Sequence, residues 1–533
     1  MARYKVLIAD AVSPKCSALF AGDDRFQIVE KKLRGQELLD QIGEYDALIV
    51  RSGCKVPEEV LDRATNLKAI ARAGVGVDNI DVVHATKRGV LVMNTPGGNT
   101  NAAAEHTLAM MLALSRNIAM ADATIRKGGW RSAKLEGNEL RGKTLGIVGL
   151  GKIGRSVAER ARAFDMDLLG FDPFLTDEMA AEMGARLCEL DELFAESDYV
   201  TVHVPLTPKT KNLIDEKVLA TMRPGARIIN CARGGIIDEL ALAKALREGQ
   251  IRGAALDVFE SEPLGEDHPF ISLENIVLTP HLGASTSEAQ EAVGLMAGHQ
   301  IKDYLAKGEI RHAVNTIALD ALELDHVSPF AELGSRLGSL QAQLLDGKAK
   351  KVVMRFAGPI FSTVSRREFV ALSALQGLFQ VSLNTPVNLV SVPHFAEEYG
   401  VTIERDAQGE SHGYRNLLTM EVTSDRENRS ISGTLFGQEN PRVVLLGEHS
   451  FDARPEGSVL MFENNDRPGM LAEVAGLLAK HTINIANVSL GRLKSGDRAL
   501  AFMNISPSLT DEVLAAVRAL DGVFWAKTAS FEG

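Results

Sequence analysis

Three residues in the middle of the chain have side chains suited to proton transfer beside an anion. His281 lies between Pro280 and Gly283, Glu262 precedes a proline, and Arg233 precedes a Gly-Gly turn. A carboxylate holds an imidazole in one tautomer so that it accepts a hydroxyl proton, and an arginine binds a carboxylate through two hydrogen bonds. Each residue alone is more often structural. Together with the nucleotide motif described next, they predict a catalytic site.

A glycine motif earlier in the chain predicts a dinucleotide site. Gly149-x-Gly151-x-x-Gly154 follows the apolar run Leu145–Val148 and precedes a stretch with helical spacing, 156–164. The first glycine permits a tight turn, the second lets the backbone approach a pyrophosphate, and the third lets the helix pack close to the strand. Asp172 ends the next apolar run, at the usual distance of about 20 residues, and would accept hydrogen bonds from a ribose 2′-OH. The motif predicts NAD rather than NADP; the alternative is a turn without a ligand.

Length and composition narrow the function classes. The chain has 533 residues, a net charge of −12 and an isoelectric point near 5.6. The length suggests three or four domains of about 150 residues, and the acidic balance argues against a nucleic-acid partner. The four cysteines form no CxxC pair, so we expect neither a disulfide framework nor a metal site. The sequence contains neither a signal-peptide pattern nor an apolar run of membrane-spanning length, so we expect a cytoplasmic protein without a membrane partner.

The first hundred residues read as one α/β unit. Apolar runs at 5–9, 47–50, 69–71 and 90–93 alternate with helical segments, which predicts a parallel sheet. Two of these runs end in arginine-containing loops, at 51–53 and at 72–76. Ligands bind outside the carboxyl ends of such strands, so the loops predict an anion site, with a solvated loop charge as the alternative.

A long apolar segment, 102–120, follows this unit and predicts a buried helix between two domains. Asn99 and Thr100 stand at its start, where an anion pocket and a plain N-cap are both compatible with the sequence. After the glycine motif, the runs 199–205, 226–235, 253–263 and 276–286 each end in polar residues, and these ends contain Arg233, Glu262 and His281.

These motifs, with Asn230–Gly235, Glu262-Pro263 and Pro280–Gly283, resemble the D-isomer-specific 2-hydroxyacid dehydrogenases from residue 1 to about 315. The resemblance implies an α/β fold in which a Rossmann-type cofactor domain, 99–285, is inserted in a flavodoxin-like substrate domain, 1–98 and 286–316. It implies that a helix over 287–305 crosses back to the first unit. It also implies that Arg233, Glu262 and His281 are catalytic.

The resemblance further implies binding roles for two sets of residues. The set expected to contact NAD is Gly149, Gly151, Lys152, Ile153, Gly154, Asp172, Val204, Cys231, Ala232, Arg233, Asp257, His281, Gly283 and Ala284. The early loops are similar to those of the phosphoglycerate dehydrogenases in this family. The set expected to contact the substrate carboxylate or phosphate is Arg51, Ser52, Gly53, Arg72, Gly74, Asn99 and Thr100.

The remaining chain resembles the two extra domains of the long form of that enzyme family. Residues 317–454 would form an α+β intervening domain with strands at 352–356, 417–422 and 442–446, and Arg442, His449 and Arg454 are candidates for an anion site or only scattered surface charges. Residues 455–533 show the β-α-β-β-α-β order of a ferredoxin-like ACT domain, with strands at 458–462, 485–490, 499–505 and 523–528. Asp466 and Asn484 are candidate effector ligands; an N-cap and a turn residue are the alternatives.

The resemblance implies NAD-dependent oxidation of 3-phospho-D-glycerate to 3-phosphohydroxypyruvate at the entry to serine synthesis. It implies a homotetramer that L-serine regulates at the ACT domain. Two alternatives stay open: a reductase of another 2-oxoacid such as glyoxylate, hydroxypyruvate or 2-oxoglutarate, and an NAD-sensing interaction protein. A turnover assay separates the last from the enzymes.

Overall fold

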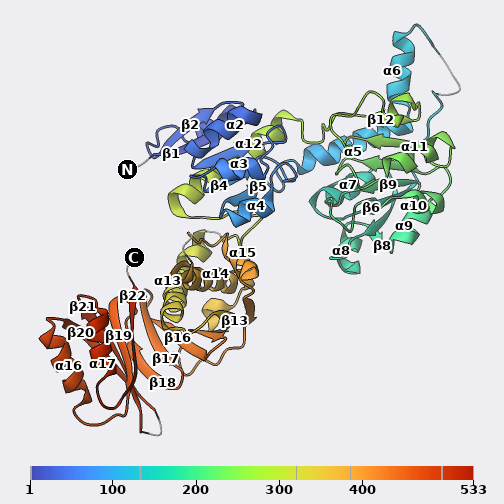
Figure 1. The fold of residues 1–533 in the computed structure, drawn as a ribbon. Helices are drawn as coiled ribbons and strands as arrows, with labels where there is room; N and C mark the ends of the chain where they lie inside the picture. Colours follow the sequence, from blue (N-terminus) through green and yellow to red (C-terminus); the bar gives the residue numbers. More distant parts are fainter. Residues whose placement is uncertain (1–2, 131–134, 320, 384–385, 494–495, 532–533) are drawn as a thin grey trace.

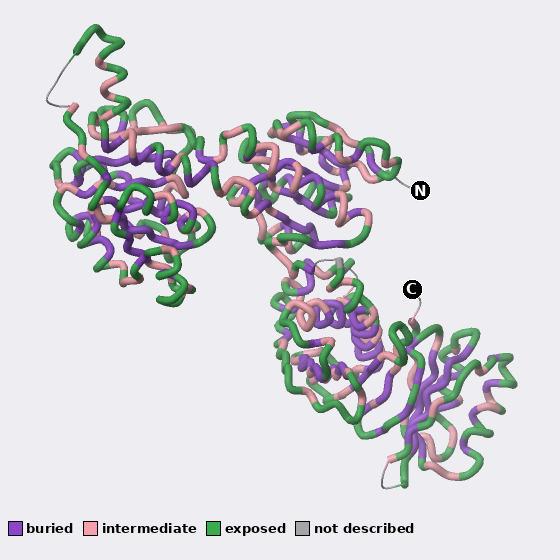
Figure 2. The backbone as a smooth tube through the Cα atoms, turned by 180° about the vertical axis from the view of Figure 1, so that it is seen from behind, coloured by how far each residue is buried: buried purple, intermediate pink, exposed green. Residues whose placement is uncertain are grey.

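The computed structural model describes residues 3–130, 135–319, 321–383, 386–493 and 496–531. Figure 1 shows two α/β units joined through α5 and α12, and a C-terminal half that extends from the first unit. Buried backbone follows the sheets in each part (Figure 2). The mixed α/β architecture expected from the sequence is confirmed.

The first unit is a parallel sheet in the order β2-β1-β3-β4-β5, the flavodoxin-like order. Its strands are β1 (Tyr4–Ile8), β2 (Phe26–Glu30), β3 (Ala47–Val50), β4 (Ala69–Arg72) and β5 (Leu91–Asn94). Its helices are α1 (Pro14–Ala18), α2 (Gly35–Gln41), α3 (Glu58–Arg63), α4 (Val82–Lys87) and the returning α12 (Ser287–Lys307). The sequence missed β2 because this edge strand buries only Phe26 and shows no continuous apolar run.

The second unit is a parallel sheet in the order β12-β11-β10-β9-β6-β7-β8, which is the Rossmann order with one added strand. Its strands are β6 (Thr144–Val148), β7 (Asp167–Phe171), β8 (Ala185–Leu187), β9 (Tyr199–Val202), β10 (Arg227–Asn230), β11 (Gly253–Leu256) and β12 (Ile276–Leu278). Its helices are α5 (Thr100–Ser115), α6 (Ile118–Arg126), α7 (Lys152–Arg162), α8 (Asp177–Glu182), α9 (Leu190–Glu196), α10 (Glu216–Thr221) and α11 (Glu239–Arg247). Helix α7, which follows the glycine motif, begins at Lys152, four residues before the expected start at 156.

The single helix expected over 102–120 is wrong. Asn117 has a φ of 52°, a left-handed conformation that interrupts helical hydrogen bonding, so α5 ends at Ser115 and α6 begins at Ile118. Helix α5 is mostly buried as expected, whereas α6 has no buried residue and projects from the unit in Figure 1. Among the described residues, no single helix has the length and apolar composition of a membrane span; α5 and α6, bent by 62°, meet that criterion only as a pair.

The third unit has a mixed sheet in the order β14-β13-β15-β16-β17-β18. Its strands are β13 (Ala349–Ala357), β14 (Thr402–Asp406), β15 (Leu417–Ser424), β16 (Asn428–Phe436), β17 (Asn440–Leu446) and β18 (His449–Ala453), and its helices are α13 (Ala321–Leu344), α14 (Val364–Ser382) and α15 (Val392–Glu398). The three strands expected here are present. The sequence missed β14, β16 and β18, in which polar and exposed residues interrupt the apolar pattern.

The fourth unit has the antiparallel order β20-β21-β19-β22 expected for β-α-β-β-α-β. Its elements are β19 (Gly457–Asn464), α16 (Met470–Lys480), β20 (Asn484–Arg492), β21 (Ala499–Ser506), α17 (Asp511–Arg518) and β22 (Val523–Phe531). One face of this sheet packs on α16 and α17. The opposite face contributes Val459, Met461 and Phe502 to the core of the third unit, so the two units share one apolar layer.

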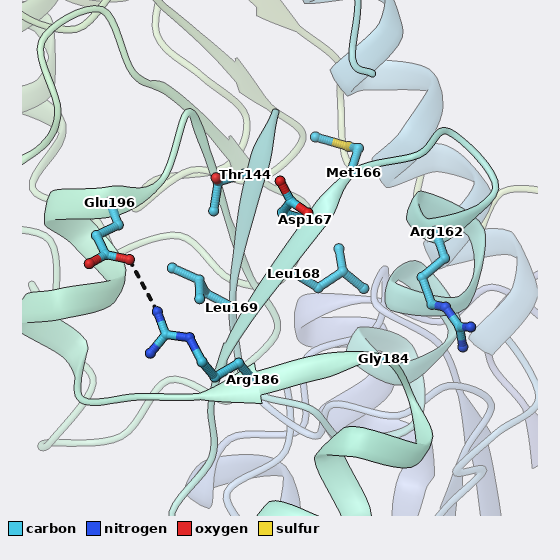
Figure 3. A pocket seen from close by; sticks show the side chains of 9 residues that line it. All are labelled: Thr144, Arg162, Met166, Asp167, Leu168, Leu169, Gly184, Arg186 and Glu196. Atoms are coloured by element: carbon cyan, nitrogen blue, oxygen red, sulfur yellow. Dashed lines mark hydrogen bonds and ion pairs between the residues drawn. The ribbon is translucent and has the colours of Figure 1, made fainter. Parts of the chain in front are cut away.

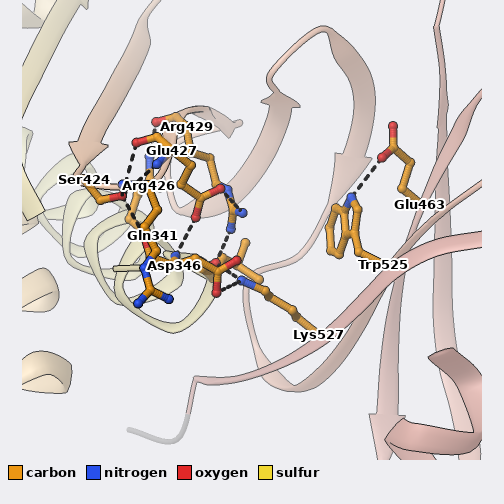
Figure 4. Close-up of polar contacts among 10 residues, drawn as sticks. Gln341, Asp346, Ser424, Arg426, Glu427, Arg429, Glu463, Trp525 and Lys527 are labelled. Carbon is orange, nitrogen blue, oxygen red and sulfur yellow. Dashed lines mark hydrogen bonds and ion pairs between the residues drawn. The ribbon is translucent and has the colours of Figure 1, made fainter. Parts of the chain in front are cut away.

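Polar contacts close the same junction (Figure 4). Lys527 of β22 and Arg429 of β16 both donate to the carbonyl of Leu344, at the end of α13, where a helix presents free acceptors and a negative dipole. Gln343 exchanges two hydrogen bonds with the backbone of Ser530, at 2.7 and 2.9 Å. The C-terminal unit is therefore attached to α13 by hydrogen bonds as well as by its core.

The contact between β6 and α7 yields a test of the fold. A Cβ on Gly154 would lie 2.0 Å from the carbonyl oxygen of Gly149, so Gly154→Ala must push α7 away from the sheet. We expect the second unit to lose about 1–3 kcal/mol of unfolding free energy. Calorimetric unfolding of the full chain measures this loss.

Gly476→Ala is the matched control, because a Cβ at Gly476 of α16 would contact nothing within 4 Å. Alanine is the better helix former by about 1 kcal/mol, so this control should unfold no earlier than the wild type. Wild-type unfolding of Gly154→Ala would contradict the close packing.

Candidate active site

A cleft of about 620 Å³ lies between the first two units, where loops from the carboxyl ends of both sheets meet. From the first unit and the start of α5 it is lined by the predicted residues Arg51, Ser52, Arg72, Gly74, Asn99 and Thr100. From the second unit it is lined by Gly151, Lys152, Ile153, Val204, Cys231, Ala232, Arg233, His281, Gly283 and Ala284. The lining does not include Gly53, Gly149, Gly154, Asp172, Asp257 or Glu262, which are considered below.

The glycine motif forms a turn with room for a dinucleotide. Gly149 has a φ of 94°, which favours glycine, and Gly154 packs on its carbonyl as described above. A Cβ at Gly151 would contact nothing within 4 Å, so the backbone before α7 faces open space. The Asp172 carboxylate lies beside this space and accepts the N–H of Leu150 at 3.0 Å. The turn, the free helix start and the carboxylate fit NAD, and this unit is an NAD-binding domain.

His281 and Glu262 form a hydrogen-bonded pair. The Nδ1 of His281 lies 2.8 Å from Glu262 Oε2. Burial would raise the pKa of the Glu262 carboxyl, but the hydrogen bonds from His281 and from the Phe259 N–H outweigh it and lower the pKa. An ionised carboxylate only accepts, so the His281 proton lies on Nδ1 and the Nε2 lone pair is free to act as a base. The two side chains also line an apolar hollow of about 330 Å³ behind the loop.

Asp257 holds the loop that bears His281. Its side chain is fully buried, with an exposed fraction of 0%. Oδ1 accepts from the Thr279 hydroxyl at 2.5 Å and from the Leu282 N–H at 2.8 Å, and Oδ2 accepts from the Gly283 N–H at 2.8 Å. Both oxygens of Asp257, expected at the nicotinamide end, are thus engaged by the loop.

A second buried carboxylate, Asp10, holds the loop that bears Arg51. Its Oδ2 accepts from the N–H of Arg51 at 2.7 Å and of Cys54 at 3.0 Å, while Oδ1 pairs with Arg34. A Cβ at Gly53 would lie 2.7 Å from this carboxylate, so glycine permits the loop to wrap around it. The Arg51 guanidinium donates to the Ala11 carbonyl at 3.1 Å, at the edge of the cleft.

Arg72 and Arg233 extend the positive charge of the cleft. Arg72 is mostly buried, and its Nε has no hydrogen-bond partner. Burial first, and then repulsion from Arg233, lower the pKa of Arg72 to about 10. Arg233 crosses the cleft to pair with Asp78, with Nε 2.9 Å from Oδ2. A buried cation with a free donor is suited to an anionic ligand.

Two further cleft residues have specific surroundings. Asn99 occupies the N-cap position of α5, as expected, but its side chain makes no capping hydrogen bond and its buried Oδ1 has no partner. Burial raises the pKa of the Cys231 thiol to about 12, so this cysteine is not a thiolate at neutral pH.

The structure does not bring the candidate effector residues Asp466 and Asn484 together within one chain. Asp466 pairs with Arg492 at the last position of β20, with a 2.8 Å contact, whereas Asn484 begins that strand. Strand β20 has nine residues, so its two ends, one at Asn484 and the other beside Asp466, lie roughly 25 Å apart. The N-cap alternative for Asp466 is wrong, since Gly469 is the N-cap of α16.

The three anion-site candidates of the third unit do not form a cationic cluster. Arg442 pairs with Asp452 at 2.9 Å, His449 lies 3.6 Å from Glu463, and Arg454 lies 3.7 Å from Glu456.

A separate hollow of about 500 Å³ lies in the second unit at the amino ends of β6 and β7, on the edge of the sheet opposite the glycine motif (Figure 3). Its Arg186 is paired with Glu192 and Glu196, and it contains none of the predicted site residues.

Sequence reasoning missed Asp10, Asp78 and Thr279. Asp10 follows the first apolar run, as Asp172 follows a later one, so the position of an acid after a strand was an available signal. Asp78 and Thr279 gave no such signal, because their partners Arg233 and Asp257 are fixed only by the fold.

The His281–Glu262 pair predicts a catalytic defect in Glu262→Gln. The amide keeps the shape but removes the charge and lets the imidazole adopt the wrong tautomer, so kcat should fall by about 10²- to 10⁴-fold. NAD affinity should stay near wild type, because Glu262 lies outside the cleft lining. Steady-state kinetics and fluorescence titration of NADH measure the two quantities.

Glu260→Gln is the control, since Glu260 is an exposed carboxylate two residues away. Equal losses in the two variants would contradict a specific role for Glu262.

Comparisons with known proteins agree with this geometry. A family model described as D-isomer specific 2-hydroxyacid dehydrogenase, NAD binding domain, matches residues 108–283. Models of the D-3-phosphoglycerate dehydrogenase intervening domain and of the ACT domain match residues 326–447 and 458–522. The NAD-binding, intervening and ACT domains expected from the sequence are confirmed.

Relatives share nearly the whole chain. The D-3-phosphoglycerate dehydrogenase of Archaeoglobus fulgidus is 39% identical over 522 residues, 97% of this chain and 98% of the relative. That of Bacillus subtilis is 37% identical over 517 residues, 96% of each. A crystal structure of D-lactate dehydrogenase from Aquifex aeolicus, complexed with NAD and lactic acid, is similar with a TM-score of 0.52 and 27% identity, covering 58% of this chain and 98% of that one. The chain belongs to the D-3-phosphoglycerate dehydrogenase family, within the D-isomer-specific 2-hydroxyacid dehydrogenases.

Proposed function

We propose that this chain oxidises 3-phospho-D-glycerate to 3-phosphohydroxypyruvate with NAD, at the entry to L-serine synthesis. The observation that carries the proposal is one cleft in which Arg51, Arg72 and Arg233 face the His281 of a His–Glu pair, next to an NAD-binding turn. The three cations match a substrate with both a carboxylate and a phosphate. Substrates such as lactate or glyoxylate have no phosphate to bind so many cations.

NAD supplies the hydride acceptor of the reaction. The N–H groups that open α7 would bind its pyrophosphate, with the close backbone approach that Gly151 permits, and Asp172 would accept hydrogen bonds from the ribose hydroxyls. The Leu150 N–H keeps the Asp172 carboxylate at the turn. Its charge repels a 2′-phosphate, which selects NAD over NADP.

His281 accepts the C2 hydroxyl proton on Nε2 while the hydride leaves C2 and the carbonyl forms. Nδ1 keeps its proton against Glu262, and the carboxylate stabilises the imidazolium that results. Arg233 binds the substrate carboxylate beside the reacting carbon. Its contact with Asp78 in this structure shows that the side chain reaches across the cleft.

We also propose that each of the four units has its own role. Residues 1–98 and 286–316 bind substrate, 99–285 bind NAD, 317–454 connect, and 455–533 bind an amino-acid effector. The chain acts as a cytoplasmic homo-oligomer, with a homotetramer as the working assembly. An exposed edge strand supports pairing of the C-terminal units of two chains. Strand β20 is the outer strand of its sheet, and its residues Val488 and Leu490 are 41% and 44% exposed.

Edge-to-edge pairing of two β20 strands about a two-fold axis runs them antiparallel. The start of one strand then lies beside the end of the other, so Asn484 of one chain approaches Asp466 of its neighbour. The Asp466 carboxylate accepts hydrogen bonds from the ammonium group of L-serine, and the Asn484 side-chain amide binds the carboxylate and the hydroxyl of L-serine. This arrangement reconciles the separation of the two residues within a chain with a joint role.

Turnover tests the main proposal. Purified full-length enzyme should reduce NAD with 3-phospho-D-glycerate far faster than with D-lactate, glycolate or D-2-hydroxyglutarate. NAD binding without turnover of any of these substrates would favour the interaction-protein alternative. Faster turnover of an unphosphorylated acid would favour another dehydrogenase.

Arg51→Ala should raise KM for 3-phospho-D-glycerate by about 10- to 100-fold, because a hydrogen bond to a charged group contributes about 1.5–3 kcal/mol. We place Arg51 at the phosphate, because Arg233 binds the carboxylate, so KM for an unphosphorylated 2-hydroxy acid should change little. Lys55→Ala is the control, an exposed cation beside the loop and outside the cleft lining. A similar loss for both acids would move Arg51 to the carboxylate.

L-Serine should inhibit the full-length enzyme through the C-terminal unit, with a coupling of about 1–3 kcal/mol. Asp466→Asn should weaken serine binding at least tenfold and leave uninhibited kcat near wild type. Glu512→Gln, an exposed carboxylate in the first turn of α17, should change neither. Calorimetric titration of serine and assays at fixed substrate measure both effects; inhibition that survives Asp466→Asn would place the effector elsewhere.

A further inference from the structure

His106 of α5 contacts the buried carboxylate behind the active-site loop. Its Nε2 lies 3.1 Å from Asp257 Oδ1 and 3.2 Å from the Thr279 hydroxyl. The imidazole is 19% exposed and Asp257 is fully buried. Neither the motifs nor the proposed mechanism gives His106 a role.

The Asp257 residue holds the loop that bears His281 through several hydrogen bonds. It binds the N–H groups of Leu282 and Gly283, and the Asp257 carbonyl accepts the His281 N–H at 2.8 Å. His281 itself has a φ of 55°, in the left-handed region that a non-glycine residue adopts only when its surroundings hold it. The carboxylate therefore keeps the base of the reaction in a strained backbone conformation.

His106 supplies a donor that this carboxylate needs. Burial would raise the pKa of the Asp257 carboxyl, but hydrogen bonds from His106, Thr279 and the Leu282 N–H outweigh it and lower the pKa. An ionised carboxylate can only accept hydrogen bonds, so the proton between His106 Nε2 and Asp257 Oδ1 belongs to His106. Removing it leaves a buried charge with fewer donors, which is more costly inside a protein than at its surface.

Helix α5 links this donor to the rest of the cleft. The helix starts at Thr100 in the cleft, and the side chain of Thr107, one residue after His106, lies beside the Cys231 thiol of the neighbouring loop. The Met110 sulfur, one turn later, lies 3.6 Å from the Thr279 hydroxyl oxygen. One face of α5 thus supports the loops that bear Arg233 and His281.

We propose that His106 is a positioning residue: through its Nε2–H it holds the Asp257 carboxylate, and thereby the loop that presents His281 to the substrate hydroxyl. The role in catalysis rests on the proposed function. The contact with the loop does not, because its effect on the loop is measurable in the absence of substrate.

The test compares His106→Leu, which removes the donor, with His106→Gln, whose amide can place a donor near the position of Nε2. Amide hydrogen exchange of the segment 279–283 in the full-length protein reports the loop directly. His106→Leu should exchange there at least tenfold faster, and kcat should fall by roughly 10- to 100-fold, as displacement of a catalytic group does. The KM for 3-phospho-D-glycerate should change by less than twofold, and His106→Gln should recover most of the protection and of kcat.

His299→Leu is the control, since His299 is an exposed histidine on α12 that should tolerate the change. Wild-type exchange of 279–283 in His106→Leu would overturn the proposal. Equal defects in the Leu and Gln variants, with kcat, KM and thermal unfolding all impaired, would assign His106 to folding and also overturn it. Changed exchange in a protein that turns over no hydroxy acid would refute the proposed function and leave the loop contact intact.

Discussion

The active site depends on carboxylates that bind the loop after a neighbouring strand. Asp257 follows β11 and holds the loop after β12, and Asp10 follows β1 and holds the loop after β3. Asp172 follows β7 and holds the turn after β6. Parallel strands bring such positions to one sheet edge, where backbone N–H groups lack ladder partners. A charged acceptor there fixes a loop more firmly than a neutral one, because charge-assisted hydrogen bonds are roughly twice as strong.

The cleft keeps two unfavourable features. His281 holds a left-handed backbone conformation, and Arg72 keeps a buried guanidinium nitrogen without a partner. Each feature costs free energy in the empty protein, of the order of 1–3 kcal/mol. The loop held by Asp257 keeps His281 from relaxing, and Arg72 is fixed as the last residue of β4. An anionic substrate relieves the second one, so its binding is favoured by groups that are already in place.

Much of the site was predictable because its signals are local. The glycine motif, the acid at 172 and the polar ends of four strands depend on residues close in sequence, and the structure has those strands at the expected places. The contact of Arg233 with Asp78 joins residues 155 positions apart, and only the packing of two units determines it. Edge strands such as β2 and β14 were missed because their side chains face water on one or both sides. The break before α6 was missed because one residue in a left-handed conformation leaves an apolar pattern unchanged.

The packing of the C-terminal half limits how a signal from the proposed effector site could reach the cleft. The C-terminal sheet is packed on both faces, on one by its own helices and on the other by the core that includes α13, so it moves with the third unit rather than against it. The third unit contacts the first through Asn388, whose amide donates to the Gly89 carbonyl at 2.8 Å, and through Val390 in the core of that unit. Under the proposed regulation, a change at the C-terminal unit would act on the position of the whole first unit relative to the NAD-binding unit. Since Arg51 and Arg72 lie on the first unit and His281 on the second, a small shift separates substrate from base without disturbing either loop. Regulation of this kind lowers turnover while the two binding surfaces stay intact.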